Sequence, residues 1–126
     1  MRGKGSLRHR QLQAMLAESC RRAGHIAVIE AFVQGKSIDL LVETFTIPRK
    51  VIAVEVQIHR DWALLDLQLR RNWEVGIRMQ IAVVQDGRVE HARAYLGRSL
   101  PPGVFEGVRV YSTSDIFRIN FAVLWV

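Results

Sequence analysis

Two acidic side chains lie inside stretches of sequence that are otherwise apolar. Asp39 lies in Ser37-Ile-Asp-Leu-Leu-Val, and Glu55 lies in Val51-Ile-Ala-Val-Glu-Val-Gln-Ile. Burying an unpaired carboxylate costs on the order of several kcal/mol, so we expect each to have a partner or to bind a metal. Both residues are therefore candidates for chemistry as well as for structure.

Side-chain alternation along a strand places Glu55 and Gln57 on the same face of the sheet. If the strands that carry Asp39 and Glu55 pair as a hairpin, Asp39 approaches Glu55 at the end of the sheet. Two such carboxylates form a hard-oxygen site, which selects Mg²⁺ or Mn²⁺ over zinc. For Asp39 alone, the capping of a turn is an alternative role.

Glu18 is the candidate for a third acidic group. On a helical wheel it lies at the flank of an apolar face, where it can lean over the sheet edge toward Asp39 and Glu55. The alternative is an exposed glutamate paired with Arg21 or Arg22.

Helices and strands must position these residues. Apolar residues at three- and four-residue steps predict a helix from Leu7 that Gly24 ends, and Asp61 begins a second helix that Gly76 ends. In that second helix Trp62, Leu65, Leu69 and Trp73 share one face. Short β-branched runs predict strands at 25–32, 38–44, 51–58 and 77–84.

The region after residue 85 is harder to interpret. We expect residues 89–95 to pair back as a strand, 96–107 to form a loop and 108–111 to form a short strand. Residues 112–115 match a helix start, and the apolar tail 121–126 fits a strand or a helix end. The predicted fold is α/β, a mixed sheet flanked by helices in the order α-β-β-β-α-β.

Composition indicates one globular domain over residues 1–126, with a basic arm at 1–6, a core at about 7–85 and a C-terminal extension at 86–126. The chain has 18 basic and 12 acidic residues, and no apolar run long enough to cross a bilayer. A single cysteine, Cys20, can form no internal disulfide, so we expect a cytoplasmic protein without a membrane partner. The basic excess suits a polyanion such as nucleic acid or an anionic membrane, and a solvated surface with charges for solubility is the alternative.

The strand hairpin with Asp39, followed by Val54-Glu55-Val-Gln57 and a helix, resembles the core of the PD-(D/E)XK nuclease superfamily. Small archaeal Holliday-junction resolvases and related phage nucleases are the most similar in length and element order. The resemblance covers about residues 7–85 and implies a restriction-endonuclease-like fold. Gln57 occupies the position of the motif lysine, as in some restriction-enzyme branches, and Lys36 or His59 are candidates to compensate for it.

The resemblance implies Mg²⁺-dependent or Mn²⁺-dependent hydrolysis of DNA phosphodiester bonds, selective for DNA structure. Asp39 and Glu55 would be metal ligands, Gln57 would position the attacking water, and Glu18 would be the helix glutamate. Candidate DNA contacts are Arg2, Lys4, Arg8, Arg10, Lys36, Arg70 and Arg71.

We expect a homodimer with two active sites and no nucleotide cofactor, because no full P-loop spacing is present. Two alternatives remain open. One is a DNA-binding or assembly module that retains the nuclease fold without catalysis, and the other is a structural partner of a larger complex.

Overall fold

The structure is a computed structural model, and it describes residues 6–125. A first helix precedes three consecutive strands, after which helices separate the remaining two strands, and two short 3₁₀ turns follow the last strand. In chain order the elements are α1 (Leu7–Arg22), β1 (Ile26–Val33), β2 (Lys36–Glu43), β3 (Val51–Gln57), α2 (Trp62–Glu74), β4 (Met79–Val84), α3 (Val89–Ser99), α4 (Pro102–Glu106), β5 (Val108–Ser112), η2 (Asp115–Arg118) and η3 (Phe121–Val123).

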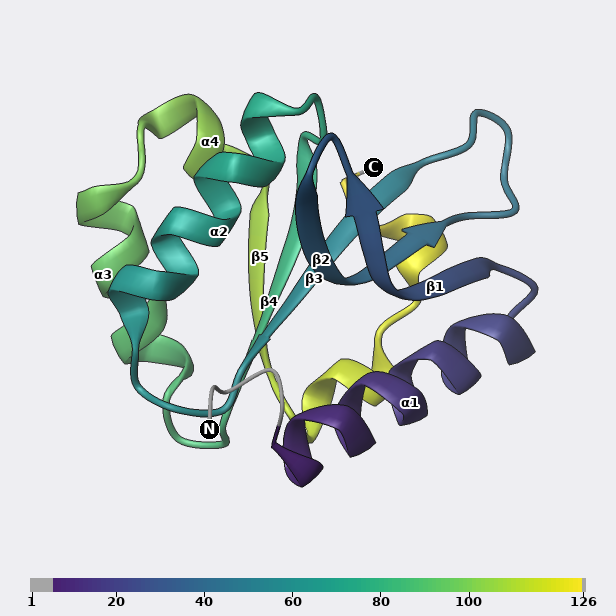
Figure 1. Cartoon of the computed structure of the whole chain (residues 1–126), viewed down its shortest axis with the longest axis horizontal. Coiled ribbons are helices and arrows are strands. Elements are labelled where there is room, and N and C mark those ends of the chain that lie inside the picture. Colours follow the sequence, from purple (N-terminus) through teal and green to yellow (C-terminus); the bar gives the residue numbers. More distant parts are fainter. Residues whose placement is uncertain (1–5, 126) are drawn as a thin grey trace.

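The five strands form one mixed sheet in the order β1-β2-β3-β4-β5. β2 is antiparallel to both β1 and β3, whereas β4 is parallel to both β3 and β5. Figure 1 shows α1 on one side of this sheet and α2, α3 and α4 together on the other. The predicted α/β architecture, a mixed sheet flanked by helices, is confirmed.

Each face of the sheet has its own apolar core. On one face, α1 and the C-terminal turns pack over alternate residues of β2, β3 and β4, and this core includes Leu16, Cys20 and Phe121. Burial raises the pKa of the Cys20 thiol to about 11. On the other face, Leu65 and Leu69 of α2 pack with α3, β4 and β5, and Trp62 and Trp73 lie partly buried against them.

Predicted helix ends coincide with glycines in the left-handed region. Gly24 after α1 has φ +90°, and Gly76 after α2 has φ +100°. The side chain of Asp61 accepts a hydrogen bond from the backbone N–H of Leu64, which confirms Asp61 as the N-cap of α2. Within residues 6–125, no helix is long and apolar enough to cross a membrane.

Two predictions for the region after β4 are wrong. Residues 89–95 do not pair back as a strand, because Val89–Ser99 form helix α3, with Ala92 and Leu96 buried at helical spacing. Residues 96–107 are not a loop, because Pro102 begins the short helix α4. The physical reason is that β4 and β5 are parallel, and a parallel pair needs a crossover long enough to hold a helix. The expected strand at 108–111 is confirmed.

Candidate functional site

Asp39 lies where the ladder of β2 with β1 is interrupted and the ladder of β2 with β3 ends. The β1–β2 register pairs Ile29 with Leu40 and Ala31 with Ile38, and it skips the pair that would join Glu30 and Asp39. The β2–β3 ladder ends at Leu40 and Val54, one position before Asp39 and Glu55 would meet. A polar side chain therefore lies fully buried at a local break in the sheet.

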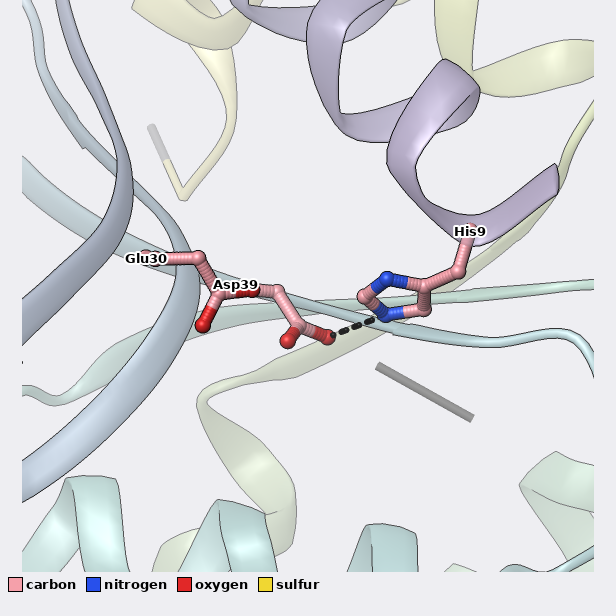
Figure 2. A group of neighbouring side chains, drawn as sticks. All are labelled: His9, Glu30 and Asp39. Carbon is pink, nitrogen blue, oxygen red and sulfur yellow. Dashed lines mark hydrogen bonds and ion pairs between the residues drawn. The ribbon is translucent and has the colours of Figure 1, made fainter. Parts of the chain in front are cut away.

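The side chain of Asp39 fills this break. Its Oδ2 accepts a 2.8 Å hydrogen bond from the backbone N–H of Val56, in place of a ladder bond. Nε2 of His9, from the first turns of α1, lies 3.2 Å from the same oxygen (Figure 2). The Asp39 carboxylate thus joins α1, β2 and β3.

A second carboxylate lies beside Asp39 on the neighbouring strand. Glu30 belongs to β1, and each of its oxygens accepts a hydrogen bond: Oε2 from Gln13 at 2.6 Å and Oε1 from Ser37 at 2.8 Å. The same Gln13 amide donates to the backbone oxygen of Asp39 at 2.9 Å. His9, Glu30 and Asp39, called here the His9 cluster, each offer a ligand atom within 4.8 Å of the others.

Glu55 is fully buried as predicted, but it is not a member of the His9 cluster. Its Oε2 accepts a 2.9 Å hydrogen bond from the side-chain amide of Asn72 on α2. Glu55 is therefore bonded to α2, whereas Asp39 is bonded to α1 through His9.

Gln57 ends β3 beside a pocket of about 200 Å³. The pocket lies at the C-terminal end of β3, between the beginnings of α1 and α2, and His9 and Gln57 both line it. Oε1 of Gln57 accepts a 3.0 Å hydrogen bond from the backbone N–H of His59, which fixes the carboxamide. His59 also lines this pocket and is exposed, whereas Lys36 is exposed in the β1–β2 hairpin.

The structure does not bring Glu18 to this site. Glu18 is exposed and pairs with Arg22 at 3.2 Å. This confirms the alternative prediction of an exposed glutamate paired with Arg21 or Arg22. The packing of Leu12, Leu16 and Cys20 on the sheet fixes the rotation of α1 about its axis. That rotation turns His9 and Gln13 inward and leaves Glu18 in solvent.

The predicted DNA contacts divide into three groups. Arg8, Arg10, Lys36 and Arg71 have exposed side chains, and the first two flank His9 in α1. Arg70 is different, because its guanidinium donates to Asp66 and to the backbone oxygen of Ser99, so it holds α2 to the end of α3. Arg2 and Lys4 lie outside the described residues.

Sequence reasoning missed three members of this site. Glu30 interrupts the apolar run Ile26-Ala-Val-Ile-Glu-Ala-Phe, and the criterion that selected Asp39 would also have selected it. His9 and Gln13 stand four residues apart and so share one face of α1. The sequence carries no signal that this face meets β2 at Asp39.

Comparisons with known proteins give a fold and no function. No family model matches the chain, and no curated protein matches it. The structure is similar to one described as the crystal structure of a protein of unknown function, AF1548, with a TM-score of 0.58 and 16% sequence identity. The match covers 84% of this chain and 58% of that chain, so this chain spans less than two thirds of its neighbour. The chain therefore shares an α/β fold with AF1548.

Proposed function

We propose that this chain is a metal-dependent endonuclease that hydrolyses phosphodiester bonds in DNA, with a PD-(D/E)XK nuclease fold. One observation carries the proposal: two fully buried carboxylates, Asp39 and Glu55, lie on adjacent strands just past the last residue pair of their ladder. Neither acid lines the neighbouring pocket, but His9 and Val56, which both contact Asp39, line it together with Gln57. Acidic groups beside a pocket are a common arrangement in sites that hydrolyse phosphate esters with metal ions.

The donor chemistry of these residues suits a divalent cation. Carboxylate oxygens are the ligands that Mg²⁺ and Mn²⁺ prefer, so Asp39 and Glu55 would hold the ion. When bound, such an ion supplies an activated water and neutralises charge on the phosphate.

The chain's own residues have distinct tasks in this proposal. Gln57, fixed by its bond from the His59 N–H, would hold the attacking water through its side-chain amide. Arg8 and Arg10, exposed on either side of His9, would contact backbone phosphates next to the pocket. Contacts to phosphates do not distinguish one base sequence from another, so these residues support an enzyme that selects DNA by its structure.

A second candidate function is DNA binding without catalysis. The position of the family lysine holds Gln57, whose oxygen is committed to the His59 N–H, and Asp39 supplies an acceptor that β3 needs at Val56. Both contacts are what a purely structural role requires. In this second function the basic surface binds DNA and the buried acids hold the sheet together.

Cleavage of four-way-junction, flap, single-stranded and linear duplex DNA separates the two functions. Each substrate is incubated with Mg²⁺, Mn²⁺ or EDTA, and the wild type is compared with Asp39→Asn and Glu55→Gln. Asp39→Asn keeps an acceptor for the Val56 N–H while it removes the charge. Glu74→Gln, at the exposed end of α2, is the matched control.

The endonuclease predicts metal-dependent cutting that both variants reduce at least 100-fold and the control retains. Binding of the same substrates without cutting under any metal condition would reject catalysis in favour of the DNA-binding module. Fluorescence anisotropy of the same DNA substrates measures binding, whether or not the protein cuts them. Size-exclusion mass tests the proposed homodimer.

A further inference from the structure

We propose that His9, Glu30 and Asp39 form a binding site for a divalent transition-metal ion such as Mn²⁺ or Zn²⁺, in preference to Mg²⁺. The inference deepens the proposed function, because Asp39 belongs to both, but it assigns two ligands that the nuclease pattern does not contain. Three elements supply the site: α1 gives His9, β1 gives Glu30 and β2 gives Asp39 (Figure 2).

The ligand atoms are already close to the spacing that a metal requires. Nε2 of His9 and Oδ2 of Asp39 are 3.2 Å apart. A ring nitrogen of His9, a carboxylate oxygen of Glu30 and one of Asp39 all lie within 4.8 Å of one another. Neighbouring ligands of one ion at metal distances near 2.1 Å are about 3 Å apart. A small inward movement of the Glu30 carboxylate therefore completes a three-ligand site.

The backbone of Glu30 adopts a conformation that a glutamate in a strand rarely has. Its φ is +53°, and the β1–β2 ladder is interrupted at this residue. Left-handed backbone at a non-glycine residue is unfavourable and is concentrated at functional sites. The conformation brings the Glu30 carboxylate to the side chains of Gln13 and Ser37, next to Asp39.

Gln13 fixes the two carboxylate residues relative to each other. Its amide nitrogen donates both to Oε2 of Glu30 and to the backbone oxygen of Asp39, and its side chain is buried. Groups that hold metal ligands from outside in this way orient the ligands and raise the affinity for the ion. Gln13 and His9 share one face of α1, so one helix provides both a ligand and its support.

The imidazole of His9 gives an independent indication of a ligand. The side chain is 2% exposed, and its Nδ1 is a buried polar atom with no hydrogen-bond partner within the described part of the chain. A buried polar atom without a partner is uncommon, and a bound ion or water is one of its ordinary explanations. His9 contacts Asp39 through Nε2, so its second ring nitrogen, Nδ1, is available to bind an ion or a water.

The donor set determines which ion fits. An imidazole nitrogen with two carboxylates suits Mn²⁺, Zn²⁺ and related transition ions, whereas Mg²⁺ prefers oxygen ligands and keeps much of its water. Among divalent ions Zn²⁺ binds such a set more tightly than Mn²⁺. Zinc should displace manganese from this site, and magnesium should not.

The test is a titration of the metal-free full chain with Mn²⁺, followed by the loss of the free-ion electron paramagnetic resonance signal. The titration is made in the Glu55→Gln chain, so that the Asp39–Glu55 ion of the proposed function does not contribute. There we expect one Mn²⁺ per chain, and at least a 10-fold weaker Kd when His9→Ala or Glu30→Gln is added. His9→Gln replaces His9→Ala if the smaller side chain fails to fold by circular dichroism. Glu18→Gln is the matched carboxylate control on α1 and, added to the same chain, should leave the Kd unchanged.

Competition and a comparison with cleavage complete the experiment. A hundredfold excess of Mg²⁺ should leave Mn²⁺ bound, and Zn²⁺ should release it. No binding, equal displacement by Mg²⁺, or an unchanged Kd in the His9 and Glu30 variants would each overturn the proposal. Glu55→Gln should retain Mn²⁺ binding while it abolishes cleavage, so metal binding without any cleavage rejects the endonuclease and leaves this site standing.

Discussion

The side-chain amide of Asn72 donates a 2.9 Å hydrogen bond to Oε2 of Glu55, and this bond ties α2 to the central strand β3. Both side chains are buried. A buried hydrogen bond to a carboxylate contributes about 1.5–3 kcal/mol, so Asn72→Ala should lower the free energy of unfolding by about that amount in urea titrations. Asn72→Asp should lower it further, because it places a second acid beside Glu55.

Two controls test whether the loss of stability comes from the hydrogen bond between Asn72 and Glu55. Arg71→Ala changes the exposed neighbour in the same helix and should alter stability by less than about 0.5 kcal/mol. A double-mutant cycle of Asn72→Ala with Glu55→Gln should show coupling. If the two effects add without coupling, the hydrogen bond does not carry the stability we assign to it.

The proposed DNA surface includes Arg8 and Arg10, which are exposed on the helix turn that bears His9. Replacing both by alanine should weaken binding to a four-way junction. It should also reduce the slope of log K against log salt by about 0.9 for each phosphate that the protein no longer neutralises. Fluorescence anisotropy over a salt series measures both quantities.

Arg98, exposed on α3 on the opposite side of the sheet, is the control for the loss of one charge, and it is compared with Arg8→Ala and Arg10→Ala made singly. Arg98→Ala lowers the net charge without touching the proposed surface, so it should leave the slope unchanged. An equal effect of the Arg98 substitution would show that general charge, and not this part of α1, attracts the DNA.

The sequence predicted the first two thirds of the fold because its signals were local. The three- and four-residue steps through Leu12, Met15 and Leu16 indicate α1, and Gly24 and Gly76 mark chain reversals that need positive φ. In residues 89–99, Val89, Ala92 and Leu96 recur at three- and four-residue steps, but the preceding Asp86-Gly87 pair, typical of a hairpin turn, favoured a strand. The helix there follows from the parallel pairing of β4 with β5, which is a long-range property.

The site was predictable only in part, for a related reason. An acid inside an apolar strand is visible in the sequence, so Asp39 and Glu55 were found as buried groups. Which side chain of α1 meets Asp39 depends on how the helix crosses and rotates over the sheet. The helical wheel left open whether Glu18 reaches Asp39 or pairs with an arginine in solvent; Glu18 pairs with Arg22, and His9 is the α1 residue that contacts Asp39.

Asp86, in the turn after β4, holds the chain that follows β5. The Ser114 hydroxyl, then the Ser114 backbone N–H, donate to its carboxylate and lower the pKa of Asp86. A carboxyl whose folded pKa is depressed contributes stability above its unfolded pKa, and this contribution is lost as pH falls through the folded value. Asp86→Asn should therefore lower Tm at pH 7, and the difference from the wild type should shrink below about pH 4. Thermal melts of both proteins from neutral to strongly acidic pH check this, and a constant difference in Tm would contradict it.

Gly107 and Gly103 are a matched pair of glycines with opposite surroundings. A Cβ on Gly107 would lie 2.1 Å from the backbone oxygen of Arg78, whereas a Cβ on Gly103 meets nothing within 4 Å. The oxygen of Gly107 also accepts hydrogen bonds from the Gln80 N–H and the Trp125 indole, so this segment cannot shift without cost. Gly107→Ala should lower the free energy of unfolding by about 1–3 kcal/mol, the usual range for overpacking.

Gly103→Ala should raise stability by up to about 1 kcal/mol, because Gly103 lies inside α4 and alanine is the better helix former. Urea titrations of the two variants and the wild type measure both effects under the same conditions. A Gly107→Ala protein as stable as the wild type would show that the start of β4 moves away from Gly107 at little cost. Because the Gln80 N–H bonds to Gly107 at the point where β4 and β5 begin, such freedom would mean that the C-terminal strand is held by its apolar contacts and not by this close approach.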